Sequence, residues 1–263
     1  MKKTKASHVN SVDGAAAVRE AARLLAPGAG MSTRRAFLRR SLTLGGLALL
    51  GGCSITDDNG VEVALAKISR LNDRVQALLF DPTRLAPTYP DSMITRPFPF
   101  NAYYGESEIR QVDGGTWRLE LSGRLADRRH WTLAQLRALP QIEQTTRHIC
   151  VEGWSAIGRW GGVAFAHFLQ RVGADLNARY VGFKCADDYY TSIDMATALH
   201  PQTILALTYD RHVLPPEYGY PLKLRMPTKL GYKNPKHIQA IFITNTYPGG
   251  YWEDQGYNWF GGS

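Results

Sequence analysis

The segment 147–155 of this chain reads Arg147-His148-Ile149-Cys150-Val151-Glu152-Gly153-Trp154-Ser155. Residues 141–151 predict a strand, so the Cys150 thiol should lie where a strand runs into a loop containing Gly and Trp. Arg147 and His148 are close in sequence and should favour the thiolate. His148 should share the strand face of Cys150, and we expect it to be a hydrogen-bonded structural histidine. Because a thiolate is a soft ligand, Cys150 is a candidate for binding a soft or high-valent metal.

Two other interpretations of this segment remain open. The sequence has three cysteines, and in an exported protein Cys150 and Cys185 would form a disulfide by default. The run 152–158 comes close to a nucleophile elbow with Ser155 as nucleophile, which would make a serine hydrolase, but its second glycine is one residue late. A P-loop, Gly-x-Gly-x-x-Gly, His-Glu-x-x-His and Cys-x-x-Cys are absent from the sequence, so nucleotide and simple zinc sites lose their usual support.

Short strands alternate irregularly with short helices on both sides of this segment. Besides 141–151, strands are predicted at 116–122, 180–185, 204–208, 222–226 and 237–244. Thr132-Leu-Ala-Gln135 is a capping box that should open a helix to Leu139, and a second helix is predicted at 164–172. Strands outnumber helices and are irregularly connected, so we predict an α+β fold with a mixed sheet.

The chain before these elements divides into two parts. In 61–80, apolar residues recur at spacings of three and four, which predicts an amphipathic helix that covers the core. Residues 81–99 contain five prolines and predict an extended wrapping segment. We therefore expect a leader at 1–53, an N-terminal helix and Pro-rich segment at 54–97, and the main domain at 98–263.

The charge of the chain is concentrated at its beginning. The 263 residues carry 31 Lys and Arg against 23 Asp and Glu, a formal net charge of +8. Residues 1–53 hold nine of the basic and two of the acidic residues. The remainder, with 22 basic and 21 acidic residues, is nearly neutral. A nucleic-acid partner is therefore not expected, because it would require a basic surface on the folded body.

Residues 31–53 have the pattern of a secretory leader, a basic region followed by a short apolar run. The apolar run 42–50 is well below the roughly 20 residues that cross a bilayer. Arg34-Arg35, followed by Ala-Phe-Leu, resembles the twin-arginine signal, which implies export to the periplasm through the Tat translocase after folding. Met31 stands where such a leader should begin, so residues 1–30 are either an extension of the leader or precede the true start.

The leader ends in Leu50-Gly51-Gly52-Cys53. This sequence resembles a lipobox, in which Cys53 is lipidated and tethers the protein to a membrane. A cleavage site of small residues that happens to contain a cysteine would look the same, and both interpretations remain open.

An acid-free basic stretch lies in the C-terminal third of the chain. Between Glu217 and Glu253 there is no acidic residue, but there are five basic ones, Lys223, Arg225, Lys229, Lys233 and Lys236. They are interleaved with Gly, Pro and apolar residues, which favours a buried anion site over a solvated basic surface.

Four motifs together resemble one family. They are Cys150-Val-Glu-x-Trp-Ser, Trp160-Gly-Gly-Val, Pro216-x-x-Gly219-x-Pro221-Leu-x-Leu and Gly231-Tyr-Lys. The similarity is to the sulfite oxidase/MsrP family of molybdopterin-dependent oxidoreductases, and it runs from about Phe98 to the end of the sequence. It implies a sulfite-oxidase-type molybdopterin-binding fold, with molybdenum and one pyranopterin as cofactors.

The resemblance also implies roles for individual residues. Cys150 would ligate molybdenum, Asn101 and Tyr104 would contact the pterin, and the phosphate-binding loop would be Asn234-Pro235-Lys236. Lys233 would hold the phosphate together with Lys236. At three positions the sequence departs from the MsrP-like pattern: Cys185 replaces Thr, Tyr218 replaces Asn and Lys223 replaces Arg. The last change keeps the charge but loses the forked geometry of a guanidinium.

The residues after Cys150 bear on the direction of the reaction. Sulfite oxidases of this family have Cys-x-Gly-Asn-Arg-Arg, which suits an oxyanion, whereas this chain has Glu152, Gly153, Trp154 and Ser155. We therefore predict reduction of a neutral S-oxide or N-oxide, with electrons from a membrane haem or quinol-linked electron-transfer subunit. Two alternatives are sulfite oxidation, with Arg147 or Arg159 supplying the anion site, and a non-catalytic lipid-anchored binding protein with a Cys150–Cys185 disulfide.

Overall fold

A computed structural model of the protein describes residues 59–263. The predicted leader at 1–53, with Met31, the Arg34-Arg35 pair and Cys53, lies outside the described residues, so those expectations remain predictions. Within the described residues, no helix combines the length and the apolar content needed to cross a bilayer.

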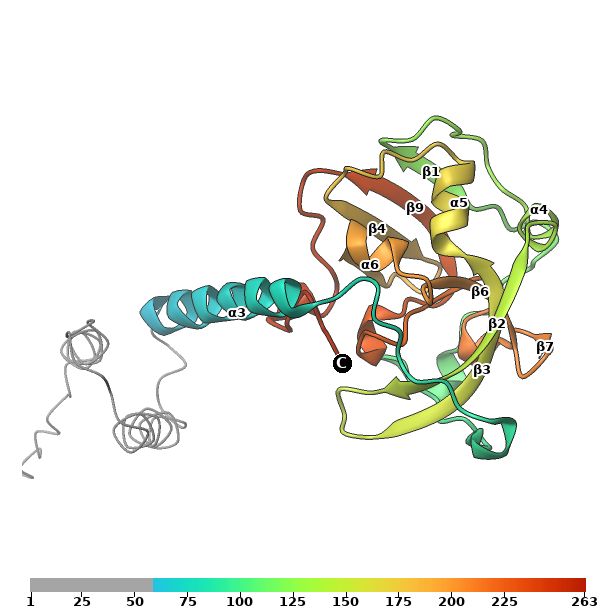
Figure 1. Ribbon diagram of the computed structural model, residues 1–263, viewed down its shortest axis with the longest axis horizontal. Coiled ribbons are helices and arrows are strands. Elements are labelled where there is room, and N and C mark those ends of the chain that lie inside the picture. The colour runs from blue at the N-terminus through green and yellow to red at the C-terminus, as the bar shows by residue number, and fades with distance from the viewer. Residues whose placement is uncertain (1–58) are drawn as a thin grey trace, which may run out of the picture. The chain divides into compact units, whose positions relative to one another are not determined.

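One sheet has the strand order β1-β9-β4-β5. Its strands are β1 (Glu120–Gly123), β9 (Ile238–Thr244), β4 (Tyr180–Cys185) and β5 (Tyr190–Asp194). β1 pairs in parallel with β9, while β4 is antiparallel to both of its neighbours. The sheet is therefore mixed, and the predicted α+β class is confirmed (Figure 1).

The second sheet carries the segment that contains Cys150. Its strands run in the order β2-β3-β6-β7, and β8 pairs with β6 as well. Their bounds are β2 (Gln141–Ile149), β3 (Ser155–Ala164), β6 (Ile204–Tyr209), β7 (His212–Val213) and β8 (Lys223–Arg225). β2 and β3 form a long hairpin, paired from Gln141 opposite Val163 to Ile149 opposite Ser155. Cys150 therefore lies at the tip of this hairpin.

Three short α-helices pack on these sheets: α4 (Leu133–Arg137), α5 (Phe165–Arg171) and α6 (Met195–Leu199). The predicted capping box opens α4: the Thr132 hydroxyl accepts from the Gln135 amide at 3.1 Å, and the Gln135 side chain accepts from the Thr132 amide at 2.8 Å. Single 3₁₀ turns are η1 (Asp91–Met93), η2 (Glu106–Glu108), η3 (Pro216–Tyr218), η4 (Gly231–Lys233) and η5 (Glu253–Gln255).

The apolar core is contributed by both sheets and by the short helices. Its members include the fully buried Leu119, Phe168, Val181, Leu205 and Leu224. A second, smaller cluster surrounds Trp160 and contains Phe98 and Leu214. The indole of Trp160 also lies beneath two cations, with Lys223 Nζ at 5.6 Å and the Arg225 guanidinium at 5.9 Å from its ring centroid. The smaller cluster therefore packs directly against the basic side chains of Lys223 and Arg225.

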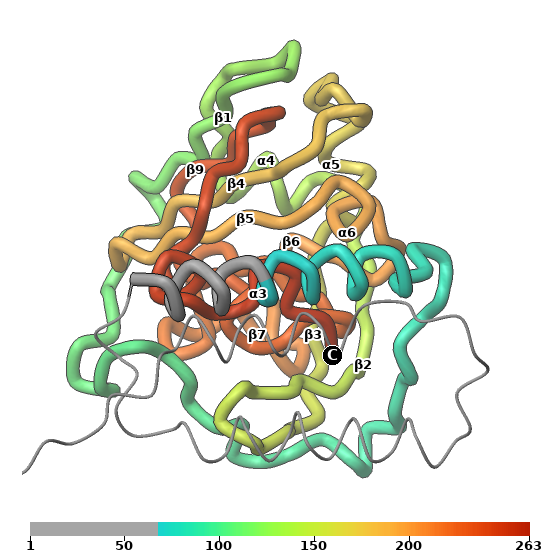
Figure 2. The backbone as a smooth tube through the Cα atoms, turned by 90° about the vertical axis from the view of Figure 1, so that its left-hand side faces the viewer, coloured from blue at the N-terminus to red at the C-terminus, as the bar shows by residue number. Residues whose placement is uncertain are grey.

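The N-terminal helix is α3 (Asn59–Leu79), and its existence was predicted from the apolar spacing. The expectation that its apolar face covers the core is wrong. Leu71 and Leu78 are 60% and 85% exposed, and the helix is held through its polar side. Asp73 accepts from the Phe260 amide at 2.8 Å and Gln76 from the Gly262 amide at 3.2 Å. Figure 2 shows the C-terminus of the chain beside the C-terminal half of α3.

Candidate active site

Cys150 is held by the tight turn at the tip of the β2–β3 hairpin. Its amide donates to the Trp154 carbonyl at 2.9 Å, and its carbonyl accepts from the Gly153 amide at 3.2 Å. Gly153 has a φ of +91°, a left-handed conformation that glycine adopts without strain. The thiol position is thus set by backbone bonds on both sides.

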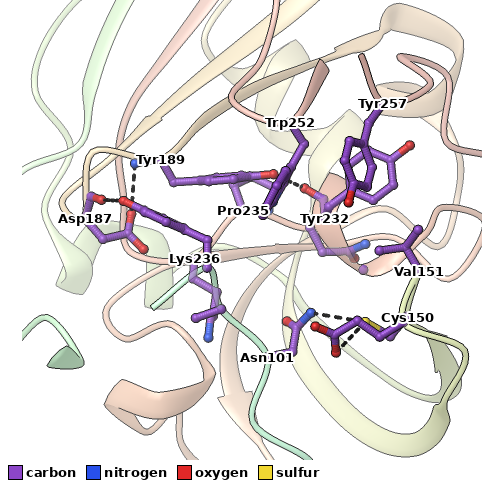
Figure 3. A pocket seen from close by; sticks show the side chains of 15 residues that line it. Asn101, Cys150, Val151, Asp187, Tyr189, Tyr232, Pro235, Lys236, Trp252 and Tyr257 are labelled. Atoms are coloured by element: carbon purple, nitrogen blue, oxygen red, sulfur yellow. Dashed lines mark hydrogen bonds between the residues drawn. The ribbon is translucent and has the colours of Figure 1, made fainter. Parts of the chain in front are cut away.

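The thiol itself is buried, since Cys150 is only 4% exposed. Asn101 Nδ2 donates to Sγ at 3.7 Å, and the thiol donates to Glu152 Oε2 at 3.6 Å (Figure 3). Trp154 Nε1 donates to the same carboxylate at 2.9 Å. Burial raises the pKa of the Cys150 thiol, and the Glu152 carboxylate adds to this effect.

The expectation that Arg147 and His148 favour the Cys150 thiolate is therefore wrong. Arg147 is exposed and its guanidinium lies over the Tyr89 ring at 5.2 Å. Burial and the nearby cations hold the pKa of His148 well below its usual range, so it carries no positive charge at neutral pH. A bound metal ion would supply the missing positive charge, because coordination deprotonates a thiol.

Three buried basic side chains lie beside the cavity without a salt-bridge partner. Among the described residues, Lys223, Arg225 and Lys236 make no salt bridge. Their hydrogen bonds go to neutral groups: Lys223 donates to the Asn234 carbonyl at 3.2 Å and Lys236 to the Glu217 carbonyl at 2.9 Å. Burial lowers the pKa of Arg225 to about 9 and that of Lys236 to about 8. Buried cations normally have a partner, so this cluster indicates an anion site.

Several buried donors next to these cations also lack a partner. Both ring nitrogens of His148 are unpaired, so the expected hydrogen-bonded structural histidine is not found. Arg225 Nε and His237 Nε2 are likewise buried and unpaired. A Cβ at Gly231 would lie 2.8 Å from His148 Nε2 and 3.2 Å from Asn101 Nδ2, so only glycine leaves room there. Unpaired buried polar groups of this kind are suited to binding a ligand.

The structure brings most of the predicted site residues together. Asn101, Cys150, Asn234, Pro235 and Lys236 all line one cavity (Figure 3). Lys223 lines a small adjoining pocket, which shares Asn101 and Lys236 with the cavity.

Two predicted residues lie near this cavity but do not line it. The hydroxyl of Tyr104 donates to Asp187 Oδ2 at 3.0 Å, and the neighbouring Tyr103 lines the cavity instead. Tyr218 reaches the adjoining pocket, and its hydroxyl donates to the Phe98 carbonyl at 2.9 Å.

Two further residues are placed elsewhere. Lys233 is fully buried and forms an ion pair with Glu253, with hydrogen bonds to the Ser192 carbonyl at 2.7 Å and to Thr191 Oγ1 at 3.1 Å. Its charge is therefore already neutralised, which corrects the phosphate-binding role expected for it. Cys185 packs in the main core, does not line the cavity and is a free thiol, as is Cys150. The alternative that joins these two cysteines in a disulfide is thus wrong.

Other lining residues escaped the sequence analysis. Asp187 places a carboxylate in the cavity wall from the β4–β5 turn, and Tyr232, Trp252 and Tyr257 supply aromatic surface. Arg225 was counted in the acid-free stretch but was given no role. That stretch was the only available signal for Arg225, and nothing in the sequence separated Asp187 from the other acidic turn residues.

The serine hydrolase interpretation finds no support in the geometry. Ser155 is exposed at the start of β3, and within residues 59–263 no histidine forms a hydrogen bond with its side chain. The same described part of the chain contains no cluster of three or more His, Cys, Asp or Glu side chains that could hold a metal ion on its own.

The side chains around the cavity fit a molybdenum-bound pyranopterin. Cys150 offers sulfur to the metal, the unpaired donors of His148 and Arg225 offer hydrogen bonds, and the buried cations match a phosphate. The cavity holds about 130 Å³, below the roughly 300–1,000 Å³ of typical small-molecule sites. A pyranopterin would therefore need more room than this cavity provides, and the adjoining pocket, which shares Asn101 and Lys236 with it, extends the site toward Lys223.

These features define a molybdopterin-dependent oxidoreductase. Residues 106–252 match the family described as "Oxidoreductase molybdopterin binding domain", more than half of the chain, and the protein belongs to that family. It is therefore an oxidoreductase whose cofactor is molybdenum with molybdopterin, and the non-catalytic alternative is excluded.

Two individual proteins and one solved structure are similar to this chain. The chain is 71% identical over 233 residues, 89% of each chain, to an Azospira oryzae protein named provisionally as protein-methionine-sulfoxide reductase subunit YedZ1. It is 29% identical over 161 residues to the MsrP catalytic subunit of protein-methionine-sulfoxide reductase from Burkholderia mallei, covering 55% of this chain and 49% of that one. The sulfane dehydrogenase SoxCD of Paracoccus pantotrophus aligns with a TM-score of 0.49 at 18% identity, over 52% of this chain and 40% of that one.

Proposed function

We propose that this protein reduces S-oxides, with protein-bound methionine sulfoxide as the substrate class, at a molybdenum centre bound to Cys150. The relatives named as methionine-sulfoxide reductases support the substrate class. The observation that carries the proposal is the distribution of charge around the cavity. The basic residues Lys223, Arg225 and Lys236 form one side. The wall around Cys150, where the substrate would bind and which we call the substrate side, has no unpaired cation among the described residues.

On the substrate side, a carboxylate lies next to the thiol. Glu152 Oε2 is 3.6 Å from Cys150 Sγ, and it would repel an anionic substrate such as sulfite. Neither of the arginines considered as an anion site lines the cavity. Arg147 lies over Tyr89, and the buried Arg159 is paired with Asp91 and Glu143.

The remaining wall of the substrate side is aromatic. Tyr232, Trp252 and Tyr257 line the cavity opposite Cys150 (Figure 3). Aromatic rings make favourable contacts with sulfur and with the methyl group of a thioether. A neutral methionine side chain bearing one S–O bond therefore suits this wall better than a charged oxyanion does.

The roles of this chain's own residues follow from their positions. Lys223, Arg225 and Lys236 would hold the phosphate of the cofactor, and Cys150 would hold the metal. The bound molybdenum would supply oxygen-atom transfer coupled to two electrons, so an S-oxide, two electrons and two protons would give a thioether and water. Burial of the thiol and the aromatic wall would restrict the access of water to the metal.

Export and the source of electrons are part of the same proposal. Arg34-Arg35 and the leader pattern support Tat-dependent export to the periplasm, and Cys53 supports a lipid anchor. The name of the Azospira relative includes the word subunit, which supports a separate electron donor. We assign that role to a membrane haem or quinol-linked partner.

Steady-state assays test the proposal directly. Purified holoenzyme with reduced viologen should turn over methionine sulfoxide, both free and in an oxidised protein, whereas sulfite with ferricyanide should give little activity. In the Cys150→Ser variant, a hard and largely protonated hydroxyl replaces the thiolate, so molybdenum content and reductase activity should both be lost while the fold is retained. Robust sulfite turnover without S-oxide reduction would instead establish a sulfite-oxidising member.

A further inference from the structure

Helix α3 exposes a continuous apolar stripe. Over residues 68–79, Ile68, Leu71, Val75, Leu78 and Leu79 are 61, 60, 45, 85 and 77% exposed. Their spacing places all five on one face of the helix. Large apolar side chains gathered on one exposed face mark an interaction site.

The other side of α3 is polar and faces the folded body. Ser69, Asp73 and Gln76 are the partly buried residues of this region, and Asp73 and Gln76 hold the amides of Phe260 and Gly262. This arrangement reverses the usual one, in which an amphipathic helix turns its apolar face to the core. Hydrogen bonds to the body therefore orient the stripe outward.

Basic residues follow one edge of the stripe. Arg70 and Arg74 are four residues apart, which at 100° per residue puts them on the edge of the stripe next to Leu71 and Leu78. Arg70 and Arg74 are exposed. Within 68–79 the acidic residue is Asp73, and it lies on the side that faces the body, where it accepts from the Phe260 amide. The edge of the stripe is thus complementary to a negatively charged surface.

We propose that α3 lies in the surface of an anionic bilayer, with its apolar stripe at the boundary of headgroups and acyl chains and its basic edge at the lipid phosphates. A polar face, a basic edge and an apolar stripe on one helix characterise interfacial helices, and anionic lipids attract basic residues beside such a stripe. The helix begins six residues after Cys53, so the predicted leader would deliver it to a membrane. The proposal holds with or without acylation of Cys53.

A probe on the stripe tests this contact without depending on any lipid anchor. Cys150 and Cys185 are buried, and Cys53→Ser removes the third cysteine of the sequence. In that background an environment-sensitive fluorophore can be placed on Val75→Cys and, as the control, on Val213→Cys, which is exposed on β7. With vesicles containing phosphatidylglycerol, we expect a blue shift and quenching by spin-labelled lipid at residue 75 but not at residue 213. The absence of both signals at residue 75 would overturn the proposal.

Flotation of the purified Cys53→Ser holoenzyme, which has no acylation site at residue 53, with the same vesicles measures the strength of binding through the folded chain. Leu71→Gln with Leu78→Gln removes apolar area and should lower the affinity by about tenfold or more. Arg70→Glu with Arg74→Glu should lower it by about tenfold or more on phosphatidylglycerol but little on phosphatidylcholine. If the double glutamine variant binds like the unmodified protein, a face other than the stripe contacts lipid and the proposal is wrong.

Charge-matched and oligomerisation controls complete the test. Arg110→Glu with Arg137→Glu changes the same charge at exposed positions elsewhere and should leave binding unchanged. A dimer in sedimentation that the Leu71 and Leu78 substitutions dissociate would identify a second copy as the occupant and overturn the proposal. Viologen-linked reductase activity should be unchanged in all variants, because α3 does not line the cavity. Failure of the proposed reductase function would therefore leave the vesicle results interpretable.

Discussion

Replacing Lys236 with Met should stabilise the cofactor-free protein while weakening cofactor binding. Burial lowers the pKa of Lys236 from 10.5 to about 8, and a difference of that size corresponds to roughly 3 kcal/mol of destabilisation while the amine is protonated. Methionine fills a similar volume without the charge. It also loses the bond to the Glu217 carbonyl, so the expected gain in free energy of unfolding at pH 7 is about 1–3 kcal/mol.

The pH dependence of this gain follows from the sign of the shift. Below about pH 8, Lys236 is protonated in both the folded and the unfolded state, and the full penalty is present. As the pH rises from about 8 to 10.5, the folded state loses its proton first, so the stability of the unmodified protein rises toward that of Lys236→Met. Urea unfolding of protein from a host that cannot make molybdopterin measures both curves.

Cofactor binding should respond in the opposite direction. Loss of one charge-assisted bond to a phosphate, roughly 1.5–3 kcal/mol, should weaken binding by about 10- to 150-fold. Lys184→Met is the matched control, since Lys184 is exposed on β4, and it should change neither quantity. A variant that is less stable than the unmodified protein when cofactor-free, or that retains full molybdopterin content, would refute the assignment of Lys236 to an anion site.

Further predictions concern Lys233 and the leader. Lys233→Met leaves the Glu253 carboxylate buried without its partner, so urea unfolding should show a loss of roughly 3–5 kcal/mol; a near-neutral effect would contradict the structural role. Replacing Arg34 and Arg35 by Lys keeps the charge but should abolish periplasmic accumulation, and an unchanged yield would indicate another export route. Mass spectrometry of the mature N-terminus should find acylated Cys53, and a different terminus would exclude the anchor.

Local signals in the sequence were sufficient for many elements. The capping box at Thr132 and Gln135 gave the start of α4, and the predicted strand 180–185 coincides with β4. β3 was missed because its glycines, Gly161 and Gly162, weaken strand propensity. They are required by packing: a Cβ at Gly162 would lie 2.0 Å from the Leu205 carbonyl oxygen on β6. That requirement is tertiary and has no signature in the local sequence.

The wrong predictions for the site also arise from contacts between residues far apart in the sequence. Lys233 and Lys236 are three residues apart in one basic stretch, yet Lys233 forms an ion pair with Glu253, whereas Lys236 donates to a backbone carbonyl and makes no salt bridge. The partner Glu253 comes from a distant turn, which charge counting along the chain cannot reveal. Periodicity likewise predicted helix α3 correctly, but it could not show which surface the apolar side faces. The position of Cys150 in the cavity wall, in contrast, could be predicted because the motif that contains it is contiguous.

The cavity wall has a consequence for the order in which the protein is assembled. Its lining comes from residues 101–103, the hairpin tip at 150–152, residues 187 and 189 at the β4–β5 turn, and the segment from 231 to 257. Trp252 and Tyr257 follow every strand of both sheets in the chain. During synthesis the thiol of Cys150 is therefore made long before the aromatic wall, and a partly synthesised chain has the proposed metal ligand but not the side chains that enclose it. Insertion of the cofactor should accordingly be a late event, completed only when these long-range contacts have formed.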